Sequence, residues 1–96
     1  MKATLSMQPF STHAPPDQRL RVRLLSRAEC HLCAVAARDL ARLSIAFDTI
    51  DVDIDEELLR RYGEVIPVVL AGEVEIVRAP FTLPALRKAL AKAGLA

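Results

Sequence analysis

The stretch Arg27-Ala28-Glu29-Cys30-His31-Leu32-Cys33-Ala34-Val35 contains both cysteines of the chain. A basic and apolar run precedes it and a long pattern of alanine, leucine and arginine follows, which indicates a strand-to-helix junction. One turn of helix brings residues i and i+3 together, so the two sulfurs can close a small disulfide ring. Cys30 would lie at the helix N-terminus, where unpaired N–H groups and the helix dipole favour a thiolate. This spacing and context indicate a redox pair or half of a metal site.

Length and composition indicate one small globular domain. The chain has 96 residues, of which 52% are hydrophobic and 26% charged, and its formal net charge is +1. A chain of this length buries one modest core, and its net charge gives no reason to expect nucleic-acid or membrane binding. We find neither an apolar run of about 18 residues nor a secretory signal. Because two cysteines are too few for a disulfide scaffold, we expect a reducing, cytoplasmic location.

The first 18 residues show no helical or strand period and contain several prolines. We therefore predict a flexible tail over residues 1–18 and a folded domain over residues 19–96. His13 lies in this predicted tail, and we interpret it as a solvated side chain rather than a third metal ligand.

A strand and a helix are predicted on either side of the cysteines. Alternation of apolar residues with arginine predicts a strand over residues 20–25, with a loop over residues 26–29. A helix is predicted over residues 31–43. Its predicted core face consists of Leu32, Ala36, Leu40 and Leu43, and its predicted water-facing side of Arg38, Asp39 and Arg42.

A second strand and a short helix are predicted next. Residues 47–52 contain alternating acidic side chains, which favour the edge of a sheet. The short helix that follows is capped by Asp53 or Asp55. We expect Gly63 to end it as the C′ residue.

The C-terminal third predicts a hairpin and a last helix. Residues 67–71 are apolar throughout, which is typical of a strand buried on both faces, and residues 74–77 return as its hairpin partner. Thr82 is the predicted cap of the last helix, and Gly94 ends it. The predicted buried side chains of this helix are Leu83, Leu86 and Leu90.

The resulting order, β-α-β-α-β-β-α, predicts an α/β fold in which three helices cover a mixed four-stranded sheet. Each of the two strand–helix–strand units predicts a right-handed crossover between parallel strands. The terminal hairpin would then add an antiparallel strand.

This order and the Cys30-His31-Leu32-Cys33 motif together resemble the thioredoxin fold, and most closely the small bacterial glutaredoxin-like proteins. The resemblance covers about residues 20–95. Its matching features, in order, are Leu24-Leu25-Ser26-Arg27, the motif itself, Asp51-Val52-Asp53-Ile54-Asp55, and Val65-Ile66-Pro67-Val68-Val69 at the start of the third strand.

The resemblance implies a thiol–disulfide oxidoreductase. It implies that Cys30 is the attacking thiolate and Cys33 the resolving thiol. It also implies that Pro67 is a cis-proline that faces the disulfide and leaves adjacent backbone groups, such as those of Ile66, free to pair with a substrate.

Charged residues of the motif region complete the predicted site. Arg27 and a protonated His31 would favour the Cys30 thiolate, whereas Glu29 would oppose it. We therefore predict Arg27, His31, Ile66 and Pro67 as substrate-contacting residues beside the catalytic pair, with no resident metal.

One segment departs from the family pattern. Glutaredoxins carry a Gly-Gly pair and an acidic residue before the last helix, where they hold glutathione, but this chain has Val77-Arg78-Ala79-Pro80-Phe81-Thr82 there. We expect no cofactor, and only weak binding of glutathione as a co-substrate.

Three functional interpretations follow. The first is an oxidoreductase that acts as a monomer on a disulfide-bearing protein or a small thiol, with glutathione or a thioredoxin-type reductase as its reductant. The second is a metal or iron–sulfur binder, which would need ligands beyond the two cysteines. The third is a redox-inactive interaction module of the same fold.

Overall fold

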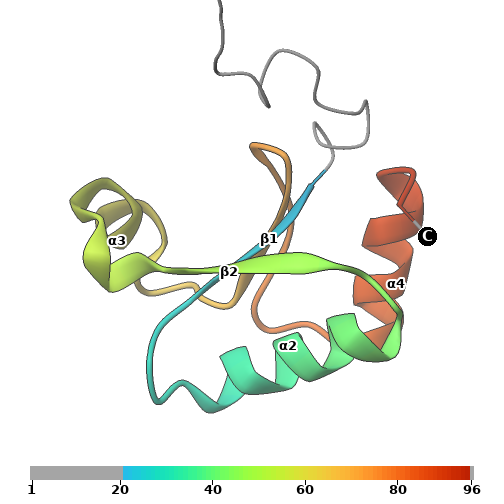
Figure 1. Cartoon of the computed structure of the whole chain (residues 1–96), viewed down its shortest axis with the longest axis horizontal. Coiled ribbons are helices and arrows are strands. Elements are labelled where there is room, and N and C mark those ends of the chain that lie inside the picture. The colour runs from blue at the N-terminus through green and yellow to red at the C-terminus, as the bar shows by residue number, and fades with distance from the viewer. Residues whose placement is uncertain (1–20, 96) are drawn as a thin grey trace, which may run out of the picture.

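The computed structural model describes residues 21–95 (Figure 1). The predicted tail over residues 1–18 lies outside the described residues. In chain order the elements are β1 (Val22–Ser26), α2 (His31–Arg42), β2 (Phe47–Asp51), the 3-10 helix η2 (Val52–Ile54), α3 (Glu56–Tyr62), β3 (Val68–Ala71), β4 (Val74–Arg78) and α4 (Leu83–Lys92). This order confirms the predicted α/β fold and adds η2, whose first residue, Val52, was predicted as the end of the second strand. No helix within residues 21–95 is long and apolar enough to cross a membrane.

The sheet has the strand order β2-β1-β3-β4. β1 and β2 are parallel, as predicted, and β2 is an edge strand. The prediction of a second parallel unit is wrong, because β3 pairs with β1 and runs antiparallel to it. Figure 1 shows the reason: α3 lies beyond one end of the sheet, so the chain re-enters the sheet from the end at which β2 left it. Antiparallel strands need no crossover along the sheet.

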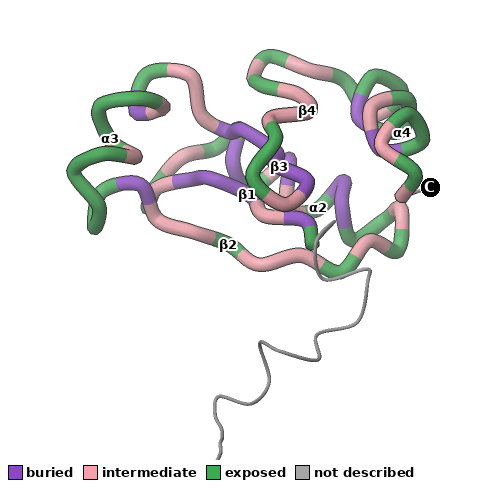
Figure 2. The backbone as a smooth tube through the Cα atoms, turned by 90° about the horizontal axis from the view of Figure 1, so that it is seen from above, coloured by how far each residue is buried: buried purple, intermediate pink, exposed green. Residues whose placement is uncertain are grey.

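β3 and β4 form the predicted antiparallel hairpin. Its turn contains Gly72 at a φ of 64°, a left-handed conformation that glycine adopts without strain. All four residues of β3 are buried, as predicted from the apolar run, and the strand lies in the most buried part of the molecule in Figure 2.

Two apolar clusters cover the two faces of the sheet, because successive side chains of a strand point to opposite faces. On one face α2 and α4 pack against β1 and β3 through Val22, Leu24, Ala36, Leu40, Val69, Leu86 and Leu90. On the other face α3 contributes Leu58 and Tyr62 to a cluster with Leu25, Val52, Val68 and Leu70. The cysteine-bearing helix α2 is therefore held by the larger cluster.

The predicted N-caps are confirmed. Leu58 N–H donates to Asp55 Oδ1 at 3.0 Å, and Ala85 N–H donates to Thr82 Oγ1 at 3.2 Å. Gly94 follows α4 at a φ of 82°, as expected of a residue that ends a helix.

Gly63 ends α3, as predicted, but as the C-cap rather than the C′ residue. Its φ of −54° is right-handed, so the position does not demand glycine for its conformation. Glycine is required for space instead, because a Cβ atom there would lie 2.5 Å from the Leu59 carbonyl oxygen.

Candidate active site

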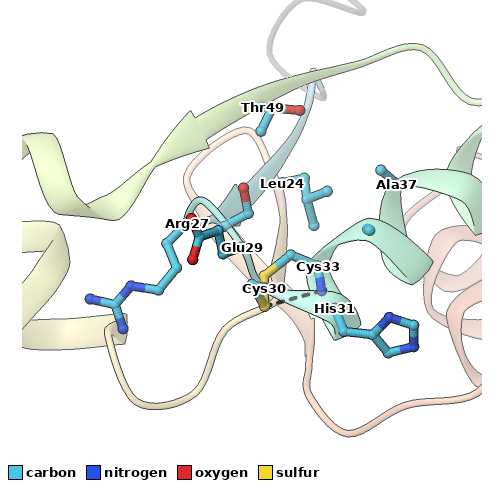
Figure 3. A pocket seen from close by; sticks show the side chains of 10 residues that line it. Leu24, Arg27, Glu29, Cys30, His31, Cys33, Ala37 and Thr49 are labelled. Carbon is cyan, nitrogen blue, oxygen red and sulfur yellow. Dashed lines mark hydrogen bonds between the residues drawn. A yellow bond between two sulfur atoms is a disulfide. The ribbon is translucent and has the colours of Figure 1, made fainter.

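The two cysteines lie where β1 gives way to α2. Cys30 is the N-cap of α2 and Cys33 lies in its first turn. Their Cα atoms are 5.2 Å apart and their sulfurs form a disulfide, a Cα separation within the normal range for such bonds. Figure 3 shows the two cysteines at the start of this helix.

The environments of the two sulfurs differ. Cys30 is half-buried, whereas Cys33 is only 4% exposed. Cys33 N–H donates to Cys30 Sγ at 3.2 Å. In the reduced protein the same N–H, together with the dipole of α2, would stabilise a negative charge on Cys30 Sγ. The arrangement fits an accessible nucleophile and a protected second thiol.

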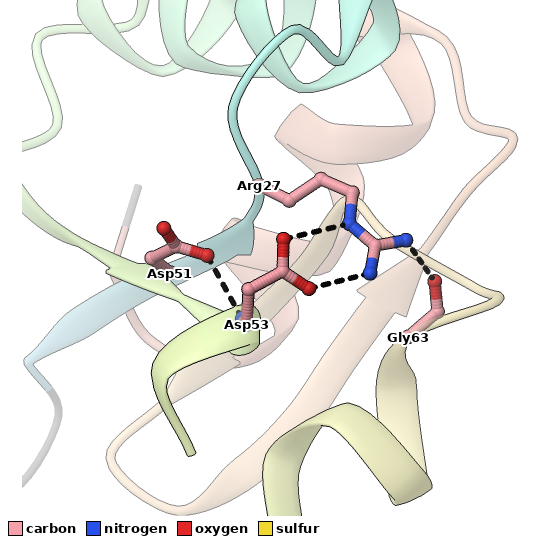
Figure 4. Close-up of polar contacts among 4 residues, drawn as sticks. All are labelled: Arg27, Asp51, Asp53 and Gly63. Carbon is pink, nitrogen blue, oxygen red and sulfur yellow. Dashed lines mark hydrogen bonds and ion pairs between the residues drawn. The ribbon is translucent and has the colours of Figure 1, made fainter. Parts of the chain in front are cut away.

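Arg27 lies in the loop before Cys30, but its guanidinium is bound elsewhere. It donates to both carboxylate oxygens of Asp53, at 2.5 and 3.2 Å, and to the Gly63 carbonyl oxygen at 3.3 Å (Figure 4). In Figure 3 this side chain reaches away from the sulfurs. The pKa of Asp53 is lowered by these hydrogen bonds and by the positive charge of Arg27.

The charge that Arg27 was expected to offer Cys30 is therefore compensated by Asp53. The ion pair instead connects the active-site loop to η2, and the Gly63 contact connects it to the end of α3. Asp51 supports the same corner, since Asp53 N–H donates to Asp51 Oδ1 at 2.8 Å. Arg27 thus fixes the loop that carries Cys30.

An open pocket of about 470 Å³ lies on one side of the disulfide. It brings together Arg27, Glu29, Cys30, His31, Ala34 and Thr49, among other residues of β1, β2 and α2 (Figure 3). His31 is exposed, with its ring beside the start of the helix. Glu29 has a φ of 61°, a left-handed conformation that is uncommon for a residue with a side chain.

Pro67 lines a recess together with Leu32 from the first turn of α2. The Ile66–Pro67 peptide bond is cis, as is Ala79–Pro80. Ala79 N–H donates to the Pro67 carbonyl oxygen at 2.9 Å, which fixes the loop before β3 against the end of β4. The Ile66 side chain packs, partly buried, against the core cluster to which α3 contributes.

Two residues of α2 depart from their predicted positions. Leu32, predicted to face the core, is 53% exposed and lies in the first turn of α2. Asp39, predicted to face water, is only 7% exposed.

Asp39 borders a recess of about 50 Å³ that sequence reasoning missed. The recess is lined by Leu32, Val35, Ala36, Asp39, Pro67, Pro80 and Phe81. The spacing of Leu32, Val35, Ala36 and Asp39 along α2 was the available signal, because residues at i, i+3, i+4 and i+7 share a helix face.

No group of three or more His, Cys, Asp and Glu side chains that could hold a metal ion occurs within residues 21–95. A metal site on the two cysteines would therefore need further ligands from outside this part of the chain.

Comparisons with known proteins agree with this architecture. The crystal structure of target protein XcR50 from X. campestris is 33% identical over 74% of this chain and 96% of its own, with a TM-score of 0.69. Its solution structure gives the same identity and a TM-score of 0.67, over 75% of this chain and 94% of its own. A glutaredoxin from Archaeoglobus fulgidus shares the fold at 18% identity, covering 74% of this chain and 86% of its own, with a TM-score of 0.56. The search of curated proteins finds no match.

The family comparison covers the strands, the helices and the cysteine pair together. Residues 21–91 match the family described as "Glutaredoxin-like domain (DUF836)". This match spans most of the chain, and the order of elements and the cysteine spacing agree with it. The chain belongs to the glutaredoxin-like domain family.

Proposed function

We propose that the protein is a thiol–disulfide oxidoreductase in which Cys30 is the nucleophile and Cys33 the resolving thiol. The observation that carries this proposal is the contrast between the two sulfurs. Cys30 is the more accessible and accepts a hydrogen bond from a helix N-terminal N–H, whereas Cys33 is buried. A redox-inactive interaction module would not need this difference.

The proposed reaction begins with the reduced pair. The Cys30 thiolate attacks one sulfur of a substrate disulfide, forms a mixed disulfide, and expels the other substrate sulfur as a thiolate that takes up a proton. Cys33, after losing its proton, attacks Cys30 Sγ and releases the second substrate thiolate. Two electrons pass to the substrate, and the Cys30–Cys33 disulfide is the oxidised product. An external thiol or a reductase must then restore the dithiol.

The backbone around Pro67 supports a peptide-like substrate. Within residues 21–95, no backbone hydrogen bond engages the Ile66 N–H or carbonyl group. An extended segment of a disulfide-bearing protein could therefore pair with Ile66 while its sulfur approaches Cys30. We propose a protein disulfide, or a small thiol other than glutathione, as the substrate class.

The segment before α4 offers few free groups that could bind glutathione, which supports the proposal that binding is weak. Arg78, the nearby cation, already donates to both carboxylate oxygens of Glu75, at 2.6 and 2.7 Å. The Ala79 N–H already donates to the Pro67 carbonyl oxygen, and Pro80 has no N–H to donate. We therefore propose that glutathione or a thioredoxin-type reductase serves as the reductant without a dedicated glutathione site. The reaction needs no resident cofactor, and the reducing cytoplasm remains the proposed location.

Mixed-disulfide trapping tests the proposal. Cys33→Ser should accumulate disulfide-linked partners from a protein-disulfide substrate such as insulin, because the resolving thiol is absent. Cys30→Ser is the matched control and should trap none and be inactive. Equal trapping by both variants would contradict the assignment of Cys30 as the nucleophile, and no turnover of any disulfide by the wild type would favour the interaction module instead.

A further inference from the structure

The Asp39 side chain is a buried carboxylate. It is 7% exposed, and neither a hydrogen bond nor an ion pair engages its carboxylate within residues 21–95. Arg42, one turn later on α2, is exposed and not paired with it. Burial of an unpaired carboxylate opposes folding. A ligand that supplied a positive charge or hydrogen-bond donor would remove this penalty.

The recess beside Asp39 can admit such a group. Its volume of about 50 Å³ exceeds the space that one water molecule needs. Apolar side chains form the other walls, among them Leu32, Val35 and Phe81. In surroundings of this kind a charge-assisted hydrogen bond is stronger than in water. An ammonium group with its last methylene group matches both the volume and the chemistry of the recess.

The recess is also close to the proposed reaction centre. It begins at Leu32, inside the cysteine motif, and includes Pro67, beside which the substrate is proposed to lie. Asp39 follows Cys30, the proposed nucleophile, by nine positions from the N-cap of the same helix, which corresponds to about 13 Å along the axis. About three residues of an extended peptide cover about 10 Å of this distance, and the long lysine side chain covers the rest.

We propose that Asp39 is a specificity-determining residue that binds a lysine-type ammonium group located about three residues from the reacting cysteine of the substrate. The proposal rests on the proposed oxidoreductase function and names a feature of its substrate. Pro80 and Phe81 would close around the aliphatic part of the lysine, while the ammonium group donates to the Asp39 carboxylate.

Single-turnover kinetics test this proposal. Reduced protein is mixed with short cysteine peptides held as mixed disulfides with 2-mercaptoethanol, and the release of peptide thiol is followed. One pair of peptides has lysine or glutamine three positions before the cysteine, and a second pair has it three positions after. In at least one pair we expect the wild type to react about tenfold faster with the lysine peptide than with the glutamine peptide. Asp39→Asn should abolish the preference, and Glu56→Gln, which removes an exposed acid from α3, should retain it.

The proposal is overturned if the wild type shows no preference in either pair, or if Asp39→Asn retains it. Should Asp39→Asn fail to fold, the lysine peptides with serine in place of cysteine are titrated into wild-type protein and amide shifts recorded. Shifts around Asp39 and Phe81 support the site, and their absence rejects it. If the wild type reduces none of the peptides, the proposed function fails, and the serine-peptide titration still decides whether the recess binds lysine.

Discussion

The backbone N–H of Cys33 donates to Cys30 Sγ at 3.2 Å, so the second cysteine supports the first through its backbone as well as through the disulfide. This hydrogen bond exists because Cys30 is the N-cap of α2. An N-cap side chain normally accepts a hydrogen bond from the N–H two or three positions later, and Cys33 is the residue three positions later. The C-x-x-C spacing therefore places a hydrogen-bond donor, as well as a resolving thiol, beside the nucleophile.

The first prediction concerns the acidity of Cys30. In reduced Cys33→Ser, which keeps the backbone N–H, we expect the pKa of Cys30 to lie below about 8.5, the usual value of a free cysteine. The increase in absorbance near 240 nm on thiolate formation measures it. A pKa at or above the usual value would show that the helix start does not activate this sulfur.

The second prediction concerns Glu29, which has a φ of 61° directly before Cys30. Glu29→Gly should relieve about 1–2 kcal/mol of left-handed strain and cost about 0.5–1 kcal/mol of unfolded-state entropy. The net result should be a stabilisation of about 0.5–1 kcal/mol, measured by urea unfolding.

Glu29→Gln is the matched control, because it removes the charge and keeps the side chain. It should leave the free energy of unfolding nearly unchanged. Both variants should lower the pKa of Cys30, since a nearby negative charge disfavours the thiolate. Stabilisation by Glu29→Gln alone would show that charge, rather than backbone strain, is the unfavourable feature at this position.

The third prediction concerns the pH dependence of the Arg27–Asp53 ion pair. The folded-state pKa of Asp53 is lowered by Arg27, so the pair stabilises the fold when the carboxylate is ionised. That contribution is complete above the ordinary aspartate value of about 3.8 and is lost as the pH falls through the lower folded value. Wild type should melt slightly above Asp53→Asn at pH 5 to 8, and the difference should disappear in strong acid.

Thermal melts of both proteins from pH 2 to 8 measure this difference. A difference that grows as the pH falls would contradict the assignment. Because the pair is exposed and fixes the loop rather than the core, the larger effect of Asp53→Asn should be on the rate of disulfide exchange.

Features that depend on neighbouring residues could be predicted from the sequence. The caps at Asp55 and Thr82 follow from short patterns, and each cap bonds an N–H three positions later. The apolar run of β3 likewise predicts burial on both faces, because each side chain of a central strand contacts one covered face of the sheet.

Features that depend on tertiary packing could not be predicted. The direction of β3 is set by where α3 lies relative to the sheet, which no local pattern specifies. Asp39 was expected in water because it is charged, but its helix face is covered by Pro80 and Phe81 from a distant segment. Arg27 likewise pairs with Asp53, 26 positions away, rather than with the adjacent sulfur.

The fourth prediction concerns the stability effect of Asp39. Asp39→Asn removes a buried charge that has no partner within residues 21–95, so we expect the free energy of unfolding to rise by about 1 kcal/mol at pH 7. Urea unfolding of wild type and variant measures the difference, with Glu56→Gln as the exposed control. A marked loss of stability in Asp39→Asn would show that the carboxylate has a structural partner.

The last prediction concerns glutathione. Pro80 cannot donate an N–H where a carboxylate would approach the start of α4, and Arg78 is occupied by Glu75. Wild type should therefore show no saturable amide shifts at Ile66, Arg78 or Thr82 with low micromolar glutathione. Pro80→Gly restores one backbone N–H, and a charge-assisted hydrogen bond of about 1.5–3 kcal/mol corresponds to roughly ten- to hundredfold tighter binding. Ala85→Gly, which adds backbone freedom to the first turn of α4 but no new N–H, is the matched control and should bind like the wild type. Tight binding by the wild type would show that the missing glycine pair does not matter and that glutathione itself is the substrate class.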